Sequence, residues 1–131
     1  MRILLDTHVL VWAMGATTRL SPETLDSLGD PANEVLFSAA SLWEIAIKFA
    51  LGRADFTLSP QRIMDEALAV GFVELPVRST AAVTVATLPL LHRDPFDRLL
   101  IAQAIAEPAV FFTADRQLAA YSELVKQVGA R

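Results

Sequence analysis

The chain has 131 residues, no cysteine and a formal net charge of −4 at pH 7. This length suits one domain, residues 1–131, and the absence of cysteine excludes disulfides and thiolate metal sites and is typical of a cytoplasmic protein. The acidic charge argues against a basic nucleic-acid-binding module, although a nuclease whose acids hold a metal ion stays possible. No apolar stretch reaches the roughly twenty residues of a membrane-spanning helix.

Apolar runs and turn residues predict alternating strands and helices. The clearest helix starts are Ser21-Pro22 and Ser59-Pro60, because Ser caps a helix and Pro fits its first turn. The tail from Ser122 is ambiguous between helix and an edge strand, and a short strand near 125–128 would supply a fifth strand. In chain order we expect strand 2–5, helix 7–14, helix 21–29, strand 35–37, helix 39–51, helix 59–71, strand 72–75, helix 79–87, helix 94–106, strand 109–112 and helix 115–121.

This alternation predicts an α/β fold, with a central parallel sheet of four to five strands covered by helices on both faces. Ligand sites in such sheets form beyond the carboxyl ends of the strands. Four acidic residues fall at expected strand ends or first helical turns, which lie along one edge of a parallel sheet. They are Asp6, Glu44, Asp97 and Asp115.

Each acid also has a purely structural explanation. Asp6 and Asp115 stand where helix N-cap residues stand. Glu44 has capping-box spacing from Ser41 and the i,i+4 spacing of an ion pair with Lys48. However, the apolar neighbours of Glu44 make an unpartnered charge costly, and a metal ion is one possible partner.

In the segment Asp94-Pro95-Phe96-Asp97, the two acids have different explanations. Asp94 suits the N-cap of a helix with Pro95 at its first position, which gives Asp94 the structural explanation. Asp97 then lies in the first turn beside the sheet edge, which gives Asp97 the functional explanation. Helix capping places acids at this edge in any case, so a shared metal site and separate capping acids stay open as alternatives.

Other polar residues near this edge are accessory candidates. Thr7 and Thr113 can bond the carboxylates or a metal-bound water. His92 is expected as a loop residue, with a contact to a substrate phosphate as its alternative. Five basic residues are candidate phosphate contacts, each with a solvated surface charge as the alternative: Arg93, Arg98, Arg116, Lys48 and Arg53.

Four segments together resemble the PIN domain, specifically the VapC-type toxins of type II toxin–antitoxin systems. They are LDTHVLVW at 5–12, SAASLWEIAIK at 38–48, DPFDRLLIAQA at 94–104 and TAD at 113–115. They occur in the family's order and span nearly the whole chain. The resemblance implies a three-layer sandwich with a five-stranded parallel sheet. It also implies a ribonuclease whose metal-binding and catalytic acids are Asp6, Glu44, Asp97 and Asp115, with Asp94 accessory.

The resemblance further implies partners for this chain. It suggests a homodimer and a cognate antitoxin whose C-terminal segment covers the active-site groove. Both agree with a hydrophobic fraction of 53%, which is high for a small monomer. The expected substrate is RNA, and no membrane partner is expected.

Carboxylate oxygens suit Mg²⁺, with Mn²⁺ able to substitute. Water activated by such an ion would hydrolyse an RNA phosphodiester and leave a 5′-phosphate and a 3′-hydroxyl. Three alternatives stay open: an inactive PIN-fold binding module, a receiver-like phosphoacceptor domain and a phosphatase with an aspartyl nucleophile. A receiver would need an acidic pair after the first strand, and the phosphatase would need an acid where His8 stands.

Overall fold

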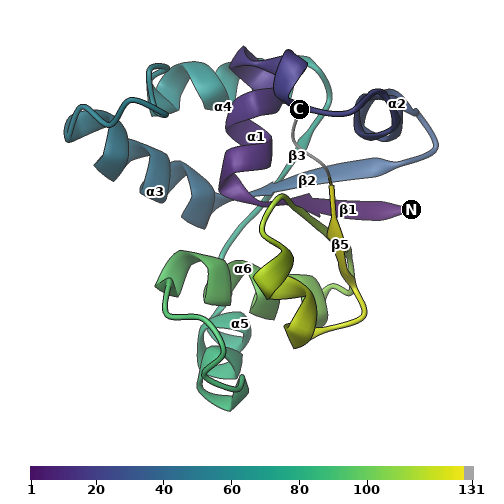
Figure 1. The fold of residues 1–131 in the computed structure, drawn as a ribbon, viewed down its shortest axis with the longest axis vertical. Coiled ribbons are helices and arrows are strands. Elements are labelled where there is room, and N and C mark those ends of the chain that lie inside the picture. Colours follow the sequence, from purple (N-terminus) through teal and green to yellow (C-terminus); the bar gives the residue numbers. More distant parts are fainter. Residues whose placement is uncertain (129–131) are drawn as a thin grey trace.

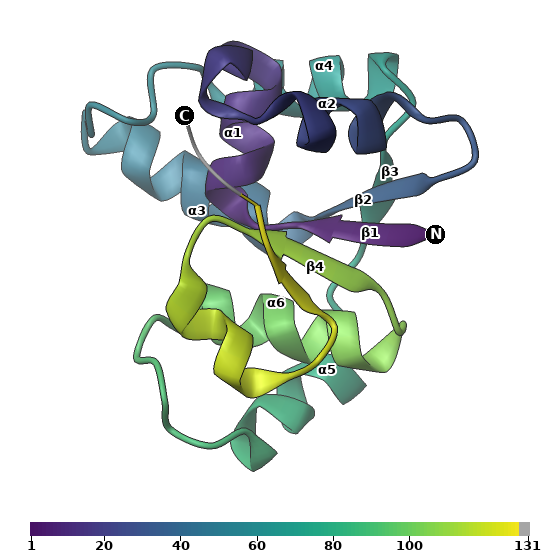
Figure 2. The same ribbon diagram turned by 45° about the vertical axis from the view of Figure 1, so that its right-hand side comes forward.

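The computed structural model describes residues 1–128, so residues 129–131 of the expected domain lie outside the described residues. Its centre is a five-stranded, all-parallel sheet in the order β3-β2-β1-β4-β5 (Figures 1 and 2). The predicted α/β class is confirmed, and the ambiguous tail supplies the fifth strand. The strands are β1 (Arg2–Leu5), β2 (Glu34–Ser38), β3 (Val73–Leu75), β4 (Val110–Thr113) and β5 (Val125–Gln127).

The helices follow the predicted order with small differences at their ends. The segment expected at 79–87 divides into an α-helix and a 3₁₀ turn, and the segment after Asp115 is a 3₁₀ helix. Ser21 and Ser59 accept backbone hydrogen bonds as N-caps. The helices are α1 (Thr7–Gly15), η1 (Thr17–Arg19), α2 (Pro22–Gly29), α3 (Ala39–Ala50), α4 (Pro60–Ala69), α5 (Ser79–Thr84), η2 (Val85–Thr87), α6 (Pro95–Ala106) and η3 (Arg116–Tyr121).

Helices cover both faces of the sheet, so the fold has three layers. Successive residues of β1 point to opposite faces: Ile3 and Leu5 join one core cluster, while Leu4 joins the other. The first cluster packs against α1 and α4, and the second packs against α6 and η3. Figure 2 shows α1, α2 and α4 on one side of the sheet and α5 and α6 on the other. The predicted helix-covered sandwich is confirmed.

Three strands bring three of the four candidate acids to one edge of the sheet. Asp6 follows β1 directly, and Asp115 lies two residues beyond the end of β4. The end of β2 leads without a loop into α3, which carries Glu44. Because the strands are parallel, their carboxyl ends share an edge.

Within residues 1–128, no helix has the length and apolar character needed to cross a membrane.

Candidate active site

Asp6 is a buried acid held from two sides. Its side chain is the N-cap of α1, with Oδ1 accepting a hydrogen bond from the Thr7 backbone N–H at 2.7 Å. Its Oδ2 accepts from the Thr113 hydroxyl, also at 2.7 Å. Burial raises the pKa of Asp6 above its ordinary value, against the lowering effect of the bonds from Thr113 and Thr7. The Thr7 hydroxyl itself donates to Ser41 Oγ at 3.0 Å.

Glu44 is more deeply buried, at 2% exposure, and only one of its carboxylate oxygens is satisfied. Oε2 accepts from Lys48 Nζ at 2.5 Å, which is the predicted i,i+4 pair. Among residues 1–128, Oε1 has no hydrogen-bond partner. The capping-box alternative was wrong, because α3 begins at Ala39 with Ser38 as its N-cap and Ser41 lies inside the helix. A buried carboxylate oxygen without a partner is costly, and a metal ion is one group that can supply the missing partner.

Asp94 and Asp97 occupy the predicted positions at the start of α6. Asp94 caps α6, and its Oδ1 accepts from the backbone N–H groups of Phe96 at 2.9 Å and Asp97 at 3.2 Å. Asp97 stands in the first turn, and its Oδ2 pairs with His92 Nε2 at 2.8 Å.

The pKa of Asp97 reports the electrostatics of this edge. It is raised to about 7, first by burial and then by the negative charges of Asp6, Asp94 and Glu44, while the bond from His92 lowers it. The negative charge of Glu44 also raises the pKa of Asp6. Asp6, Glu44 and Asp97 therefore repel one another in a shared site.

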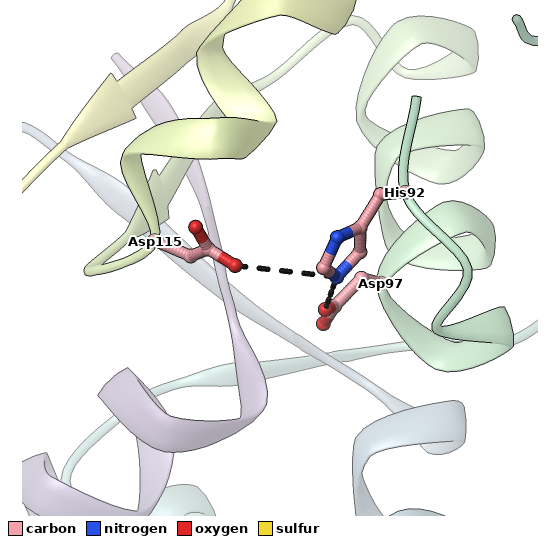
Figure 3. A group of neighbouring side chains, drawn as sticks. All are labelled: His92, Asp97 and Asp115. Atoms are coloured by element: carbon pink, nitrogen blue, oxygen red, sulfur yellow. Dashed lines mark hydrogen bonds and ion pairs between the residues drawn. The ribbon is translucent and has the colours of Figure 1, made fainter. Parts of the chain in front are cut away.

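Asp115 reaches the same site from the other side. It caps η3 through Oδ1, which accepts from the Gln117 N–H at 2.9 Å, and its own N–H donates to Thr113 Oγ1 at 3.0 Å. Its Oδ2 faces His92 Nε2 at 4.0 Å (Figure 3). Asp6 and Asp115 also line one cavity of about 270 Å³, together with His8, Trp12, Asp55 and Ala114.

His92 lies in a loop, as expected, but its contact with the acids of the site was not predicted from the sequence. Its Nε2 and one carboxylate oxygen each of Asp97 and Asp115 lie within 4.8 Å of one another. The available signals were weak: it is one of two histidines and stands two residues before Asp94. Its position between two acids from different elements is decided by packing of the loop before α6.

The basic residues separate into two groups. Arg93 and Arg116 are exposed next to Asp94 and Asp115. Lys48 instead pairs with the buried Glu44, and its ammonium lies 5.3 Å from the centre of the Phe56 ring. The phosphate contact expected for Lys48 stays a prediction, and its ammonium is already paired with Glu44.

Arg98 is also placed differently from expectation. Its guanidinium donates to the Tyr121 hydroxyl at 3.1 Å and to four backbone carbonyls of η2 and the loop that follows it. These donors hold the chain before α6, and the phosphate contact expected for Arg98 stays a prediction. The carbonyls are those of Val85 at 3.1 Å, Leu88 at 3.4 Å, Pro89 at 3.0 Å and His92 at 3.5 Å.

Comparison with known proteins agrees with this architecture. The structure is similar to a chain in the crystal structure of VapBC2 from Rickettsia felis bound to a DNA fragment from their promoter, with a TM-score of 0.72, 18% identity, and coverage of 98% of this chain and 99% of that one. It is also similar to a chain of VapBC-1 from nontypeable Haemophilus influenzae, with a TM-score of 0.62, 18% identity, and coverage of 97% and 98%. At this identity the likeness concerns the fold.

No curated protein matches the chain at a significant level. The PIN domain family model matches residues 3–124, which is nearly the whole chain. That span includes all four sequence segments that resemble the family and all four candidate acids. The chain therefore belongs to the PIN domain family.

Proposed function

We propose that this protein is a metal-dependent endoribonuclease and the toxin component of a toxin–antitoxin pair. One observation carries the proposal: buried Glu44 Oε1 lacks a partner within residues 1–128, at an edge where Asp6 and Asp97 add further negative charge. Helix capping explains Asp6 and Asp115 locally, but it does not explain Glu44. Membership of the PIN family, whose domains are generally nucleases, supports the same conclusion.

The donor set fits a hard divalent cation. Asp6, Glu44, Asp97 and Asp115 would hold it through carboxylate oxygens, which suit Mg²⁺ and Mn²⁺. A cation would satisfy the free oxygen of Glu44 and offset the repulsion that raises the pKa of Asp97. Asp94 has its own structural task as the cap of α6 and stays outside this set.

When bound, such an ion supplies an activated water and a positive charge beside the phosphodiester. The protein supplies orientation: the Thr7 N–H and the Thr113 hydroxyl hold both oxygens of Asp6. Attack by water, rather than by the 2′-hydroxyl of RNA, leaves a 5′-phosphate and a 3′-hydroxyl. Arg93 and Arg116 are exposed beside the acids, and we assign them contacts to flanking phosphates.

The partners follow from exposed apolar surface and from the similar structures. Trp43 and Leu51 of the α3 region are 63% and 65% exposed, and Trp43 packs edge-on against Phe96 at 5.2 Å between ring centres. Both similar structures are described as VapBC. These observations support a homodimer and a cognate antitoxin that covers the active-site groove beside α3. We also infer action in the cytoplasm, which agrees with the absence of cysteine.

The test is incubation of the purified chain with total RNA, with and without Mg²⁺ or Mn²⁺, followed by sequencing of the fragment ends. We expect cleavage only with the metal, and 5′-phosphate ends. Asp6→Asn is the matched control, because it keeps the size of the side chain and removes its charge. RNA binding without cleavage by the wild type in either metal would instead make the chain an inactive PIN-fold binding module.

A further inference from the structure

The loop between η2 and α6 is attached to the rest of the protein by two side chains. The Tyr121 hydroxyl accepts hydrogen bonds from the backbone N–H groups of Leu91 at 3.1 Å and His92 at 2.7 Å. Arg98 donates to the Tyr121 hydroxyl and to the His92 carbonyl, among others. We call Arg98 and Tyr121 the clamp. It holds the backbone of His92 on both its N–H and its carbonyl side.

The clamp is built on two of the elements beside which candidate metal ligands lie, α6 and η3. Arg98 follows Asp97 directly on α6. Tyr121 is the last residue of η3, whose N-cap is Asp115. The His92 ring lies between these two acids, 2.8 Å from Asp97 and 4.0 Å from Asp115 (Figure 3). The clamp therefore joins α6, η3 and the His92 loop into one unit.

We propose that His92 is a positioning residue for the Asp97 carboxylate, and that the clamp fixes His92 in the place where it does so. This inference rests on the proposed metal-dependent function. A carboxylate that binds a metal is oriented by its own hydrogen bonds, and loss of such a bond weakens metal binding. The His92 N–H supplies that bond to Asp97 Oδ2.

The chemistry of the clamp suits this task. The planar guanidinium of Arg98 reaches five acceptors at once, which the single ammonium of a lysine does not reproduce. The Tyr121 ring packs against the core cluster that includes Leu118, while its hydroxyl reaches the loop. Tyr121→Phe therefore removes the loop contact and keeps the packed ring.

The experiment measures Mn²⁺ affinity of the full chain by electron paramagnetic resonance, independently of RNA cleavage. We expect His92→Ala to weaken binding by about 10- to 100-fold, and Tyr121→Phe by about 3- to 10-fold. His92→Gln should recover most of the affinity, because its amide N–H can replace the ring donor. Arg98→Lys should resemble Tyr121→Phe, and Arg62→Lys on α4, where Arg62 bonds Glu66, is the matched control.

A second measurement uses the two histidine ring signals in the NMR spectrum of the metal-free protein. Tyr121→Phe should shift and broaden the His92 signal and leave that of His8 in place. Wild-type Mn²⁺ affinity in both His92→Ala and Tyr121→Phe would overturn the proposal. Equal loss in His92→Gln and His92→Ala would also overturn it, since His92 would then bind the metal directly.

The two proposals fail in different ways. If the wild type binds no Mn²⁺, the metal-dependent function is wrong. The NMR result then decides the clamp alone: an unshifted His92 signal in Tyr121→Phe overturns it, and a shifted signal supports it.

Discussion

The Thr113 hydroxyl donates to Asp6 Oδ2 at 2.7 Å and joins the ends of the neighbouring strands β1 and β4. The same hydroxyl oxygen accepts from the Asp115 N–H at 3.0 Å. One buried threonine thus orients the first acid of the site and the loop of the last one. Asp6 keeps its N-cap bond to Thr7 at the same time, so capping and site geometry share one carboxylate.

Thr113→Val tests this relationship, because valine keeps the shape of the side chain and removes the hydroxyl. We expect RNA cleavage to fall by about 10- to 100-fold, since Asp6 loses the bond that orients it. The free energy of unfolding should fall by about 1–3 kcal/mol, because buried polar groups lose their partner.

Thr24→Val is the matched control for this change. Thr24 is also buried, but its hydroxyl bonds to Ser21 at the start of α2. The Thr24→Val variant should be less stable than the wild type, while its folded form should cleave RNA at the wild-type rate. Equal cleavage rates for Thr113→Val and Thr24→Val would show that the Thr113 hydroxyl has no role in the active site.

Asp97 should make the metal-free protein less stable as pH rises. Its pKa is about 7 in the folded chain against an ordinary value of 3.8, so the folded state keeps a proton that the unfolded state has already lost. Stability due to this group therefore falls between about pH 4 and pH 7 and stays low above pH 7. The measurement is thermal unfolding in a chelator across this range.

Asp97→Asn should remove this loss, because an amide has no proton to lose. Without metal at pH 8 we expect the variant to be more stable than the wild type by about 1–3 kcal/mol. This free energy is smaller than the full pKa shift would give, because solvent reaches part of the Asp97 side chain. RNA cleavage should be lost. A wild type and variant with parallel stability curves would show that Asp97 titrates normally.

Mg²⁺ should stabilise the folded chain in a pH-dependent way. At a free concentration 100 times the dissociation constant, the expected gain is about 2.7 kcal/mol. The stabilisation by Mg²⁺ should be smaller at pH 5.5 than at pH 8, because at pH 5.5 Asp97 holds a proton that competes with the ion. Calorimetry with increasing Mg²⁺ measures this, and Asp6→Asn, which lacks one charge of the site, should show a reduced gain.

Arg116 should contribute to RNA binding without contributing to stability. It is exposed directly after Asp115. In an Asp6→Asn background, which binds without cutting, Arg116→Gln should weaken binding to single-stranded RNA and reduce the slope of log affinity against log salt by about 0.7. The matched control is Arg62→Gln on α4. An unchanged slope in Arg116→Gln would exclude a phosphate contact at this residue.

The sequence by itself determined the order of the elements, the parallel sheet and the edge at which the four acids stand. These properties depend on local signals: apolar runs of strand length, Ser-Pro helix starts, and glycines such as Gly52 and Gly71, whose φ angles of 71° and 95° lie in the left-handed region. The positions of Asp94 and Asp97 were also determined locally, because both lie in the first turn of one helix.

Only the tertiary structure decided which partner each polar side chain has. The sequence offered Lys48 and Arg98 as phosphate contacts, yet one pairs with buried Glu44 and the other holds the loop before α6. His92 lies between Asp97 and Asp115 because α6, η3 and that loop pack together. A long polar side chain reaches many neighbours, and packing of distant segments selects among them, which no local pattern encodes.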